Sequence, residues 1–202
     1  MLERTTSPTL GETRARDSVN ADDMALIDRV ARGDCAAFET LYRSYFPRLV
    51  RFLEKMTRRP AMVEEILNDT MLVVSQNAHK YNRCSKVSTW IFAIAYRKGL
   101  KALKRLNEPV EPDAEFHDLQ GASPLEPNEE FLQVQLRRML TVAVDALSAN
   151  HRVVIELTYF HGAGYREIAE IMGCPIETVK TRMFHARRRL KALLPERLED
   201  VL

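Results

Sequence analysis

Basic side chains are concentrated near the end of the chain, on a predicted helix that runs from about residue 176 to residue 191. After Glu177 this stretch holds no acid and six cations, namely Lys180, Arg182, Arg187, Arg188, Arg189 and Lys191. Thr178, Thr181 and His185 stand among them. Arg and Lys side chains hold phosphates, whereas polar side chains such as these can reach base edges. The pattern favours contact with nucleic acid, and a solvated basic surface is the alternative.

A shorter amphipathic segment precedes the basic helix and predicts how it is held. Its apolar positions are Ile168, Ala169, Ile171 and Met172. Gly173, Cys174 and Pro175 then interrupt the period, because Gly permits positive φ and Pro lacks a donor. The second helix is expected to begin at Pro175 or Ile176 and to bury Ile176, Val179, Met183 and Leu190. Two helices around a tight turn indicate a helix-turn-helix that reads the DNA major groove.

A second basic element is predicted between Thr89 and Leu106. Trp90 lies at its start, and its later turns carry the cations Arg97, Lys98, Lys101, Lys104 and Arg105 without an acid among them. Tyr81 and Asn82 belong to the polar segment just before it. Aromatic rings beside a basic track suit unpaired nucleic acid, since rings stack on bases and cations follow phosphates. Trp90 could equally be a core residue whose neighbouring lysines are merely solvated.

The helix predicted over residues 61–77 has the opposite charge. Glu64, Glu65 and Asp69 lie on one side of it, but no His partners them at helical spacing and no nucleophile–base pair is present. A protein-docking face or plain solvation explains the acids better than catalysis does, and no catalytic residue is assigned.

The elements that position these groups are predicted to be helices throughout. Of the 202 residues, 46% are hydrophobic, only 7 are Gly, and apolar spacings of three and four dominate. Asp22 is expected to cap the first helix, and Gly33-Asp34 is expected to separate this helix from the second one. Pro47 is expected to open a third helix, and Ser88 or Thr89 is expected to cap the basic helix that ends near Leu106. The predicted fold class is therefore all-α.

An acidic segment divides the helices into two groups. Residues 107–130 hold eight acids and four prolines without any Lys or Arg, which is the composition of a flexible linker. The predicted organisation is a flexible N-terminal tail over residues 1–21, a helical domain over 22–106, a linker over 107–128, and a helix-turn-helix domain over 129–202.

Cofactors, secretion and membrane insertion have no support in the sequence. Cys35, Cys84 and Cys174 are far apart, without metal-ligand spacing, and are expected to be small buried or half-buried residues. There is no apolar signal-like region at the N-terminus and no run of 18 apolar residues. We expect no metal, no cofactor, no membrane span and a cytoplasmic location.

Three blocks in a fixed order resemble the extracytoplasmic-function (ECF) sigma factors, the two-domain branch of the sigma-70 family. The segment 63–72, VEEILNDTML, is similar to that family's region 2.2, and Ser88-Thr89-Trp90-Ile91 with Ile94-Ala95 is similar to region 2.3. Tyr165–Ala169 and Thr178–Arg182 resemble region 4.2. The resemblance covers about residues 22–106 and 129–194, nearly all of the patterned sequence.

The resemblance implies a role for each domain. The first would bind core RNA polymerase through Glu65, Asn68 and Asp69. It would also open the promoter −10 element, with Tyr81, Asn82, Trp90, Arg97, Lys98 and Lys101 as DNA-binding residues. The second would bind the −35 element through Tyr165, Arg166, Thr178, Lys180, Thr181, Arg182, Phe184, His185 and Arg188. An anti-sigma factor is a further partner that the family implies.

The chain departs from the family pattern at positions that bear on specificity. Asn68 stands where Gln is usual, and Arg97 and Lys101 stand where Asn is frequent, so the preferred −10 base does not follow from the resemblance. Glu177 replaces a frequent Gly at the start of the basic helix. The alternative function is a helix-turn-helix repressor or activator that never joins the polymerase; a small helical enzyme acting on nucleic acid would need a metal cluster or triad that the sequence lacks.

Overall fold

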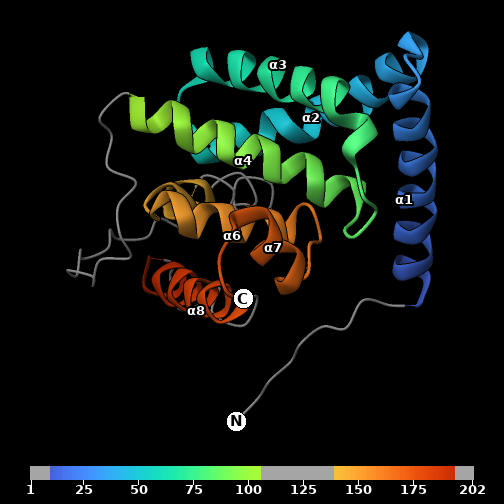
Figure 1. The fold of residues 1–202 in the computed structure, drawn as a ribbon. Coiled ribbons are helices and arrows are strands. Elements are labelled where there is room, and N and C mark those ends of the chain that lie inside the picture. The colour runs from blue at the N-terminus through green and yellow to red at the C-terminus, as the bar shows by residue number, and fades with distance from the viewer. Residues whose placement is uncertain (1–9, 106–138, 194–202) are drawn as a thin grey trace, which may run out of the picture.

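The computed structural model describes residues 10–105 and 139–193, and every regular element in these ranges is a helix (Figure 1). The helices of residues 10–105 are α1 (Leu10–Ala31), α2 (Cys35–Thr57), α3 (Pro60–Asn77), the short 3₁₀ turn η1 (Ala78–Lys80) and α4 (Val87–Arg105). Residues 139–145 are helical as well, and α6 (Ala149–Tyr159), α7 (Tyr165–Met172) and α8 (Ile176–Leu193) follow. The all-α prediction is confirmed.

Helices α2, α3 and α4 pack on one another around a core that includes Leu41, Phe52, Leu67 and Ile91. The carboxylate of Asp34 starts α2 by accepting a hydrogen bond from the Ala37 amide (3.0 Å), and this contact lowers the pKa of Asp34. Pro60 starts α3, where its missing amide hydrogen costs nothing. In Figure 1, α1 stands upright at one end of this group, beside the loop that joins η1 to α4.

Three predicted helix starts are wrong. α1 begins at Leu10, so Asp22 lies inside a helix and residues 10–21 continue it. Pro47 lies within α2 rather than opening a new helix, because Tyr45 and Leu49 on either side of it are fully buried and their packing outweighs one lost hydrogen bond. α4 begins at Val87, whose amide donates to the Asn20 side chain on α1 (3.2 Å) instead of relying on Ser88 or Thr89.

The second group of helices is held by its own apolar contacts. Ser148 caps α6, and α6 and α7 both pack against α8 through Val153, Leu157, Ile168 and other buried side chains. The break between α7 and α8 falls at Gly173, as predicted, with φ of 63° in the left-handed region that Gly tolerates. Ile176, the first residue of α8, lies at the surface, which corrects its predicted burial.

The two groups of helices contact each other directly. α4 packs on α7, and α2 packs on α6 (Figure 1). The predicted acidic linker, residues 1–9 of the predicted tail and residues 194–202 lie outside the described residues.

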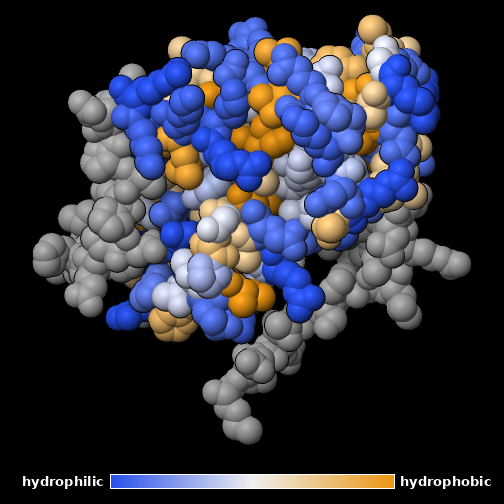
Figure 2. Space-filling model, viewed as in Figure 1, coloured by the Kyte–Doolittle hydropathy of each residue, from blue (hydrophilic) through white to orange (hydrophobic). Residues whose placement is uncertain are grey.

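Other surface features of the described ranges also bear on the predictions. Cys35 and Cys84 are exposed and Cys174 is half-buried, so burial was the wrong expectation for the first two. Among the described helices, none combines the length and the apolar character needed to cross a bilayer. The face in Figure 2 is largely hydrophilic, with hydrophobic patches between the charged side chains of the upper helices.

Candidate nucleic-acid interface

In the helix-turn-helix, one side of α8 is buried and the opposite side is exposed to solvent. Val179, Met183, Ala186 and Leu190 recur at three- and four-residue spacing and face α6 and α7. The left-handed backbone at Gly173 lets its own amide and that of Cys174 bond back to the carbonyl of Ala169, which ends α7 sharply. The turn therefore directs α8 away from α7 and leaves its outer side accessible along its length.

The outer side of α8 combines cations with one large apolar ring. Lys180, Thr181 and Arg188 are exposed, and Phe184 between them is 62% exposed. Lys180 forms an ion pair with Glu177 (2.9 Å), and the Thr181 hydroxyl donates to the Glu177 carbonyl (2.9 Å). An exposed aromatic side chain on a basic helix can contact thymine methyl groups in a major groove.

The remaining predicted −35 residues are divided between the surface and the domain interior. Arg166 is exposed on α7, while Tyr165 and Thr178 are half-buried. His185 is half-buried, and its ring lies 6.3 Å from the buried His151 ring and 5.5 Å from Phe184. The guanidinium of Arg182 contacts the Cys174 sulfur at 3.6 Å. The structure thus places Thr181 and Phe184 at the surface and tilts His185 toward the core of the domain.

The second basic element is built from the loop before α4 and from α4 itself. The rings of Tyr81 and Trp90 lie 5.3 Å apart, centre to centre, and both are half-buried. Burial raises the pKa of the Tyr81 hydroxyl, which donates to the carbonyl of Ser85 across the loop. Asn82 is exposed. Trp90 packs against the core and is only half-buried, so its core role is observed, whereas its contact with unpaired bases stays a prediction.

The cations of α4 do not form a single free row. Arg97 and Lys101, one turn apart, are exposed. Lys98 instead forms an ion pair with Asp69 on α3 at 3.0 Å. One of the predicted DNA-binding cations and one of the predicted docking acids are therefore partners in the described structure.

The outer side of α3 carries the predicted docking residues together with an apolar residue that sequence reasoning left unassigned. Glu65, Asn68 and Asp69 are exposed. Leu72, which continues the same stripe at helical spacing, is 55% exposed, and the Asn68 side chain accepts a hydrogen bond from Tyr42 on α2 (3.0 Å). In the sequence, the only signal for this residue was an apolar side chain at helical spacing from polar positions. We call these four residues of α3 the docking face.

A group of charged residues between the two helical groups was not predicted at all. Glu156 on α6 is almost fully buried and pairs with Arg51 on α2 (2.6 Å). The Arg51 guanidinium also lies 3.5 Å from the centre of the Phe160 ring. Arg152 on α6 is buried and donates to the backbone carbonyl of Lys55 on α2 (2.7 Å). The contacts join residues about one hundred positions apart, so no pattern within a short stretch of sequence predicts them.

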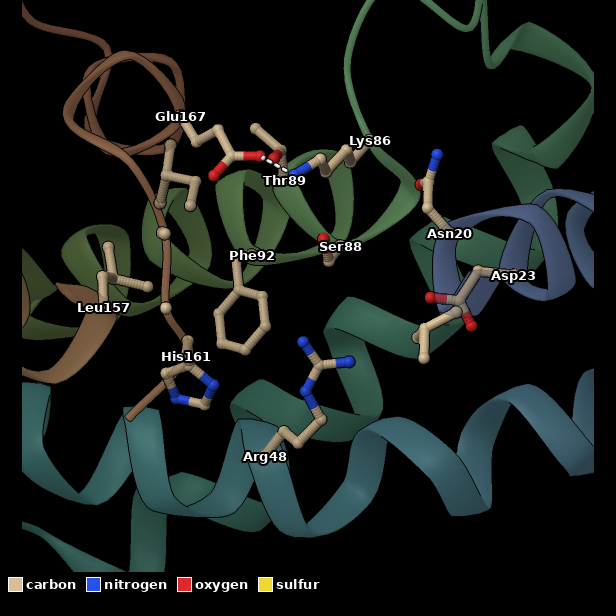
Figure 3. Close-up of a pocket in the computed structure, with 14 residues that line it drawn as sticks. Asn20, Asp23, Arg48, Lys86, Ser88, Thr89, Phe92, Leu157, His161 and Glu167 are labelled. Atoms are coloured by element: carbon tan, nitrogen blue, oxygen red, sulfur yellow. Dashed lines mark ion pairs between the residues drawn. The ribbon is translucent and has the colours of Figure 1, made fainter. Parts of the chain in front are cut away.

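A cavity of ≈ 250 Å³ lies along the same boundary (Figure 3). Its walls include Asp23 from α1, Arg48 from α2 and Phe92 from α4, with His161 and Glu167 from the second group. Figure 3 shows Lys86 reaching Glu167, an ion pair of 2.8 Å, and the His161 ring beside Phe92. The other carboxylate oxygen of Glu167 accepts from the Gly164 amide (2.8 Å), so this side chain both starts α7 and ties it to the last residue of the loop before α4.

Comparisons with known proteins match both halves of the chain. Residues 41–108 match the family model described as Sigma-70 region 2, and residues 137–190 match the one described as Sigma-70, region 4. Among solved structures, CnrH in complex with the cytosolic domain of CnrY has a TM-score of 0.60 at 21% identity, covering 85% of this chain and 96% of that one. The sigma factor RpoE from Bartonella quintana, solved with the anti-sigma factor NepR, has a TM-score of 0.54 at 23% identity, covering 77% and 95%. These likenesses concern the fold.

Relatives in sequence extend over nearly the whole chain. The ECF RNA polymerase sigma-E factor of Haemophilus influenzae is 28% identical, covering 84% of this chain and 93% of that protein. The ECF RNA polymerase sigma factor RpoE of Cereibacter sphaeroides is 31% identical over 180 residues, covering 87% of this chain and 97% of the relative. With the region 2 and region 4 matches in the same order, the chain belongs to the extracytoplasmic-function sigma factors of the sigma-70 family.

Proposed function

We propose that this protein joins core RNA polymerase in the bacterial cytoplasm, directs it to promoters and promotes strand opening, with no catalysis of its own. Residues 22–106, together with the earlier turns of α1 from Leu10, form the domain that docks on the polymerase and handles the −10 element. Residues 129–202 form the domain that binds the −35 element as duplex, and residues 107–128 connect the two. The docking face on α3 supplies the polymerase contact, and the outer side of α8 supplies the duplex contact.

The observation that carries this proposal is the presence of two different nucleic-acid surfaces in one chain. The outer side of α8 has the shape and charge of a major-groove reader. Tyr81 and Trp90, beside exposed cations of α4, have the chemistry that suits unpaired bases. A repressor or activator that binds only duplex DNA has no use for the second surface, so the alternative function is less well supported.

Simultaneous use of both surfaces requires the two helical groups to separate. Elements centred 35 and 10 base pairs upstream of a start site lie about 25 base pairs apart, or roughly 85 Å at ~3.4 Å per base pair. Domains of this size have radii of gyration of about 12 Å, so their centres lie only about 30 Å apart when they touch. A 22-residue linker can extend to roughly 75 Å, which is enough to allow the separation. We therefore propose that the described arrangement is a closed form that opens on the polymerase.

An anti-sigma factor is a further proposed partner. CnrH was solved in complex with the cytosolic domain of CnrY, and RpoE was solved in complex with a protein that is named as an anti-sigma factor, NepR. The present chain shares their fold, and its closed form leaves apolar side chains such as Leu72 and Phe160 at the surface. A protein that covers these side chains would hold the closed form and block docking.

Reconstitution with purified core RNA polymerase tests the proposed function. The chain should co-purify with core enzyme and should support run-off transcription from a subset of a randomised promoter library. Core enzyme alone serves as the blank. If the chain binds duplex DNA specifically but neither associates with core enzyme nor supports transcription, the repressor or activator alternative is correct.

A further inference from the structure

The loop that carries Tyr81 and Asn82 is held in one shape by contacts from inside and outside. Within the loop, the Asn82 side chain accepts from the Cys84 amide (3.1 Å), and the Tyr81 hydroxyl donates to the Ser85 carbonyl. Arg83, at the tip, adopts a left-handed backbone with φ of 60°. A non-glycine residue seldom takes that conformation unless surrounding contacts impose it, and such residues gather where function needs a fixed geometry.

The contacts from outside come from α1. One terminal nitrogen of the Arg83 guanidinium donates to both carboxylate oxygens of Asp28, at 2.8 and 2.7 Å. At the other end of the loop, the Asn20 side chain accepts the Val87 amide that begins α4 (3.2 Å). Asp28 and Asn20 lie about two turns apart on α1, so one rigid helix fixes both the tip of the loop and the point where the loop becomes α4.

From this geometry we infer that Asp28 and Asn20 are positioning residues for −10 recognition, acting as a clamp from α1 on the loop 81–86. This inference rests on the proposed function of that loop. Neither residue falls within the stretch that matches the region 2 model, which begins at residue 41. A loop that reads a base binds more selectively when its shape exists before the base arrives, because no ordering cost is incurred on binding.

Arg83 could either hold the shape of the loop through Asp28 or bind a DNA phosphate, and the clamp requires the first of these roles. An Arg near DNA can hold a phosphate, but here Asp28 occupies its guanidinium and neutralises its charge. If the pair stays intact on DNA, Arg83 works only through the shape of the loop. If Arg83 leaves Asp28 for a phosphate, then removing Asp28 frees the arginine and does no harm to recognition. The two cases predict opposite results for Asp28→Ala.

The test uses holoenzyme reconstituted from core RNA polymerase and the full chain. Wild-type holoenzyme first selects its preferred promoter from a randomised library, and that promoter is then randomised only at the −10 element. We expect Asp28→Ala and Arg83→Ala each to reduce base discrimination at one −10 position by about fivefold, the lower end for one base contact. The double variant should be no worse than either single variant, because the two residues act as one unit.

Several measurements distinguish loss of the clamp from a general loss of folding or of binding. Affinity for core enzyme and for a −35 duplex should match wild type, and the salt dependence of promoter binding should be unchanged. The exchanged pair Asp28→Arg with Arg83→Asp should restore discrimination, since Asp tolerates the left-handed conformation at position 83. The matched control is Arg29→Ala, which removes the exposed ion pair to Asp34 from the same turn of α1.

The outcomes distinguish the clamp from the function on which it rests. The variant Asn82→Ala tests separately whether the loop 81–86 contributes to −10 recognition. If Asn82→Ala relaxes −10 preference while Asp28→Ala does not, the loop reads DNA and the clamp is refuted. If Asp28→Ala leaves discrimination intact and Arg83→Ala lowers the salt dependence by about one ion, Arg83 holds phosphate instead. If Asn82→Ala also has no effect on −10 preference, the assignment of the loop is wrong and the clamp is refuted with it.

Discussion

At the scale of single residues, the described structure uses buried polar groups to fix helices against one another. Asp23 on α1 is buried and accepts a hydrogen bond from the Tyr45 hydroxyl on α2 (2.5 Å). The Arg48 guanidinium lies over the Tyr45 ring, 4.7 Å from its centre. Burial raises the pKa of Asp23 above 3.8, and the Tyr45 hydrogen bond and the Arg48 charge oppose this only in part.

Asp23→Asn should therefore change how stability depends on pH. Because the folded chain holds the Asp23 proton more tightly than the unfolded chain does, this residue makes the free energy of unfolding fall as pH rises from about 3.8 through its raised pKa. The amide of Asn can still accept from Tyr45 but carries no charge. We expect the difference in the free energy of unfolding, variant minus wild type, to increase as the pH rises from 3 to 7, as measured by urea unfolding. A difference that stays constant over this range would contradict the assignment.

The exposed residues of α8 should separate into positioning and reading groups. Arg188→Ala should weaken duplex binding for all sequences and lower the salt dependence by about one ion, because a phosphate contact carries no sequence information. Thr181→Ala should instead relax preference at one or two −35 positions, at a cost of about 1–3 kcal/mol of discrimination. Binding to a randomised −35 library at two salt concentrations measures both. Uniform loss for Thr181→Ala would move Thr181 to the positioning group.

At the scale of elements, α3 shows how one helix serves two purposes. Its inner side contributes Val63, Leu67 and Val74 to the core, while its outer side is the docking face. Lys98 contacts only one carboxylate oxygen of Asp69, whereas Arg83 contacts both oxygens of Asp28, and both side chains of the Asp69–Lys98 pair are partly solvated, so this pair adds little stability. Contacts on the outer side of α3 can therefore change without disturbing the packed inner side.

Asp69→Lys and Leu72→Ser should each weaken association with core enzyme by an order of magnitude or more, about 1.4 kcal/mol. Both should leave the unfolding midpoint within a few degrees of wild type, since surface substitutions away from packed sites cost little. Fluorescence titration of core enzyme gives the affinity. Lys98→Ala is the control, because it removes the Asp69 partner without touching the docking face. Tight binding by both docking-face variants would show that the polymerase contact lies elsewhere.

At the scale of the whole molecule, the closed form depends on charges that are buried between the two helical groups. Glu156 has only 3% of its side chain exposed, whereas its partner Arg51 is 47% exposed. The Glu156 carboxylate oxygen that pairs with Arg51 also lies 3.5 Å from Nε2 of His161. Loss of the carboxylate would leave Arg51 able to regain water, so the interface would lose its pairing with this arginine without trapping the arginine charge. If closure and promoter binding are competing states of one chain, as we propose, the interface contacts set their balance.

Glu156→Gln should shift the chain toward the open state. We expect a larger radius of gyration by X-ray scattering and tighter association with core enzyme, with the helical content unchanged. The effect on affinity should be a few-fold to tenfold, matching about 1 kcal/mol of lost pairing. Glu39→Gln is the matched control, because Glu39 pairs with Arg43 at 2.5 Å on the surface of α2 and outside the interface. A compact variant with wild-type affinity would show that this pair does not hold the two groups together.

The sequence by itself determined the helices, the helix-turn-helix and the family, because each depends on patterns that repeat within a few residues. The spacing of Val179, Met183 and Leu190 specifies which side of α8 is buried, and Gly173 specifies where the turn falls. The assignment of individual side chains to DNA or polymerase stays a prediction. Tertiary structure alone decided that Pro47 stays inside α2, where burial of its neighbours compensates for a lost hydrogen bond.

Tertiary structure also decided which distant residues meet. Asn20 caps α4 from 67 positions away, and Arg51 meets Glu156 from 105 positions away. Such pairs depend on how whole helices pack, and nothing in the spacing of neighbouring residues encodes them. The local period thus indicates which sides of the helices are exposed, whereas the fold decides how the loop 81–86 is held and how the two groups of helices contact each other.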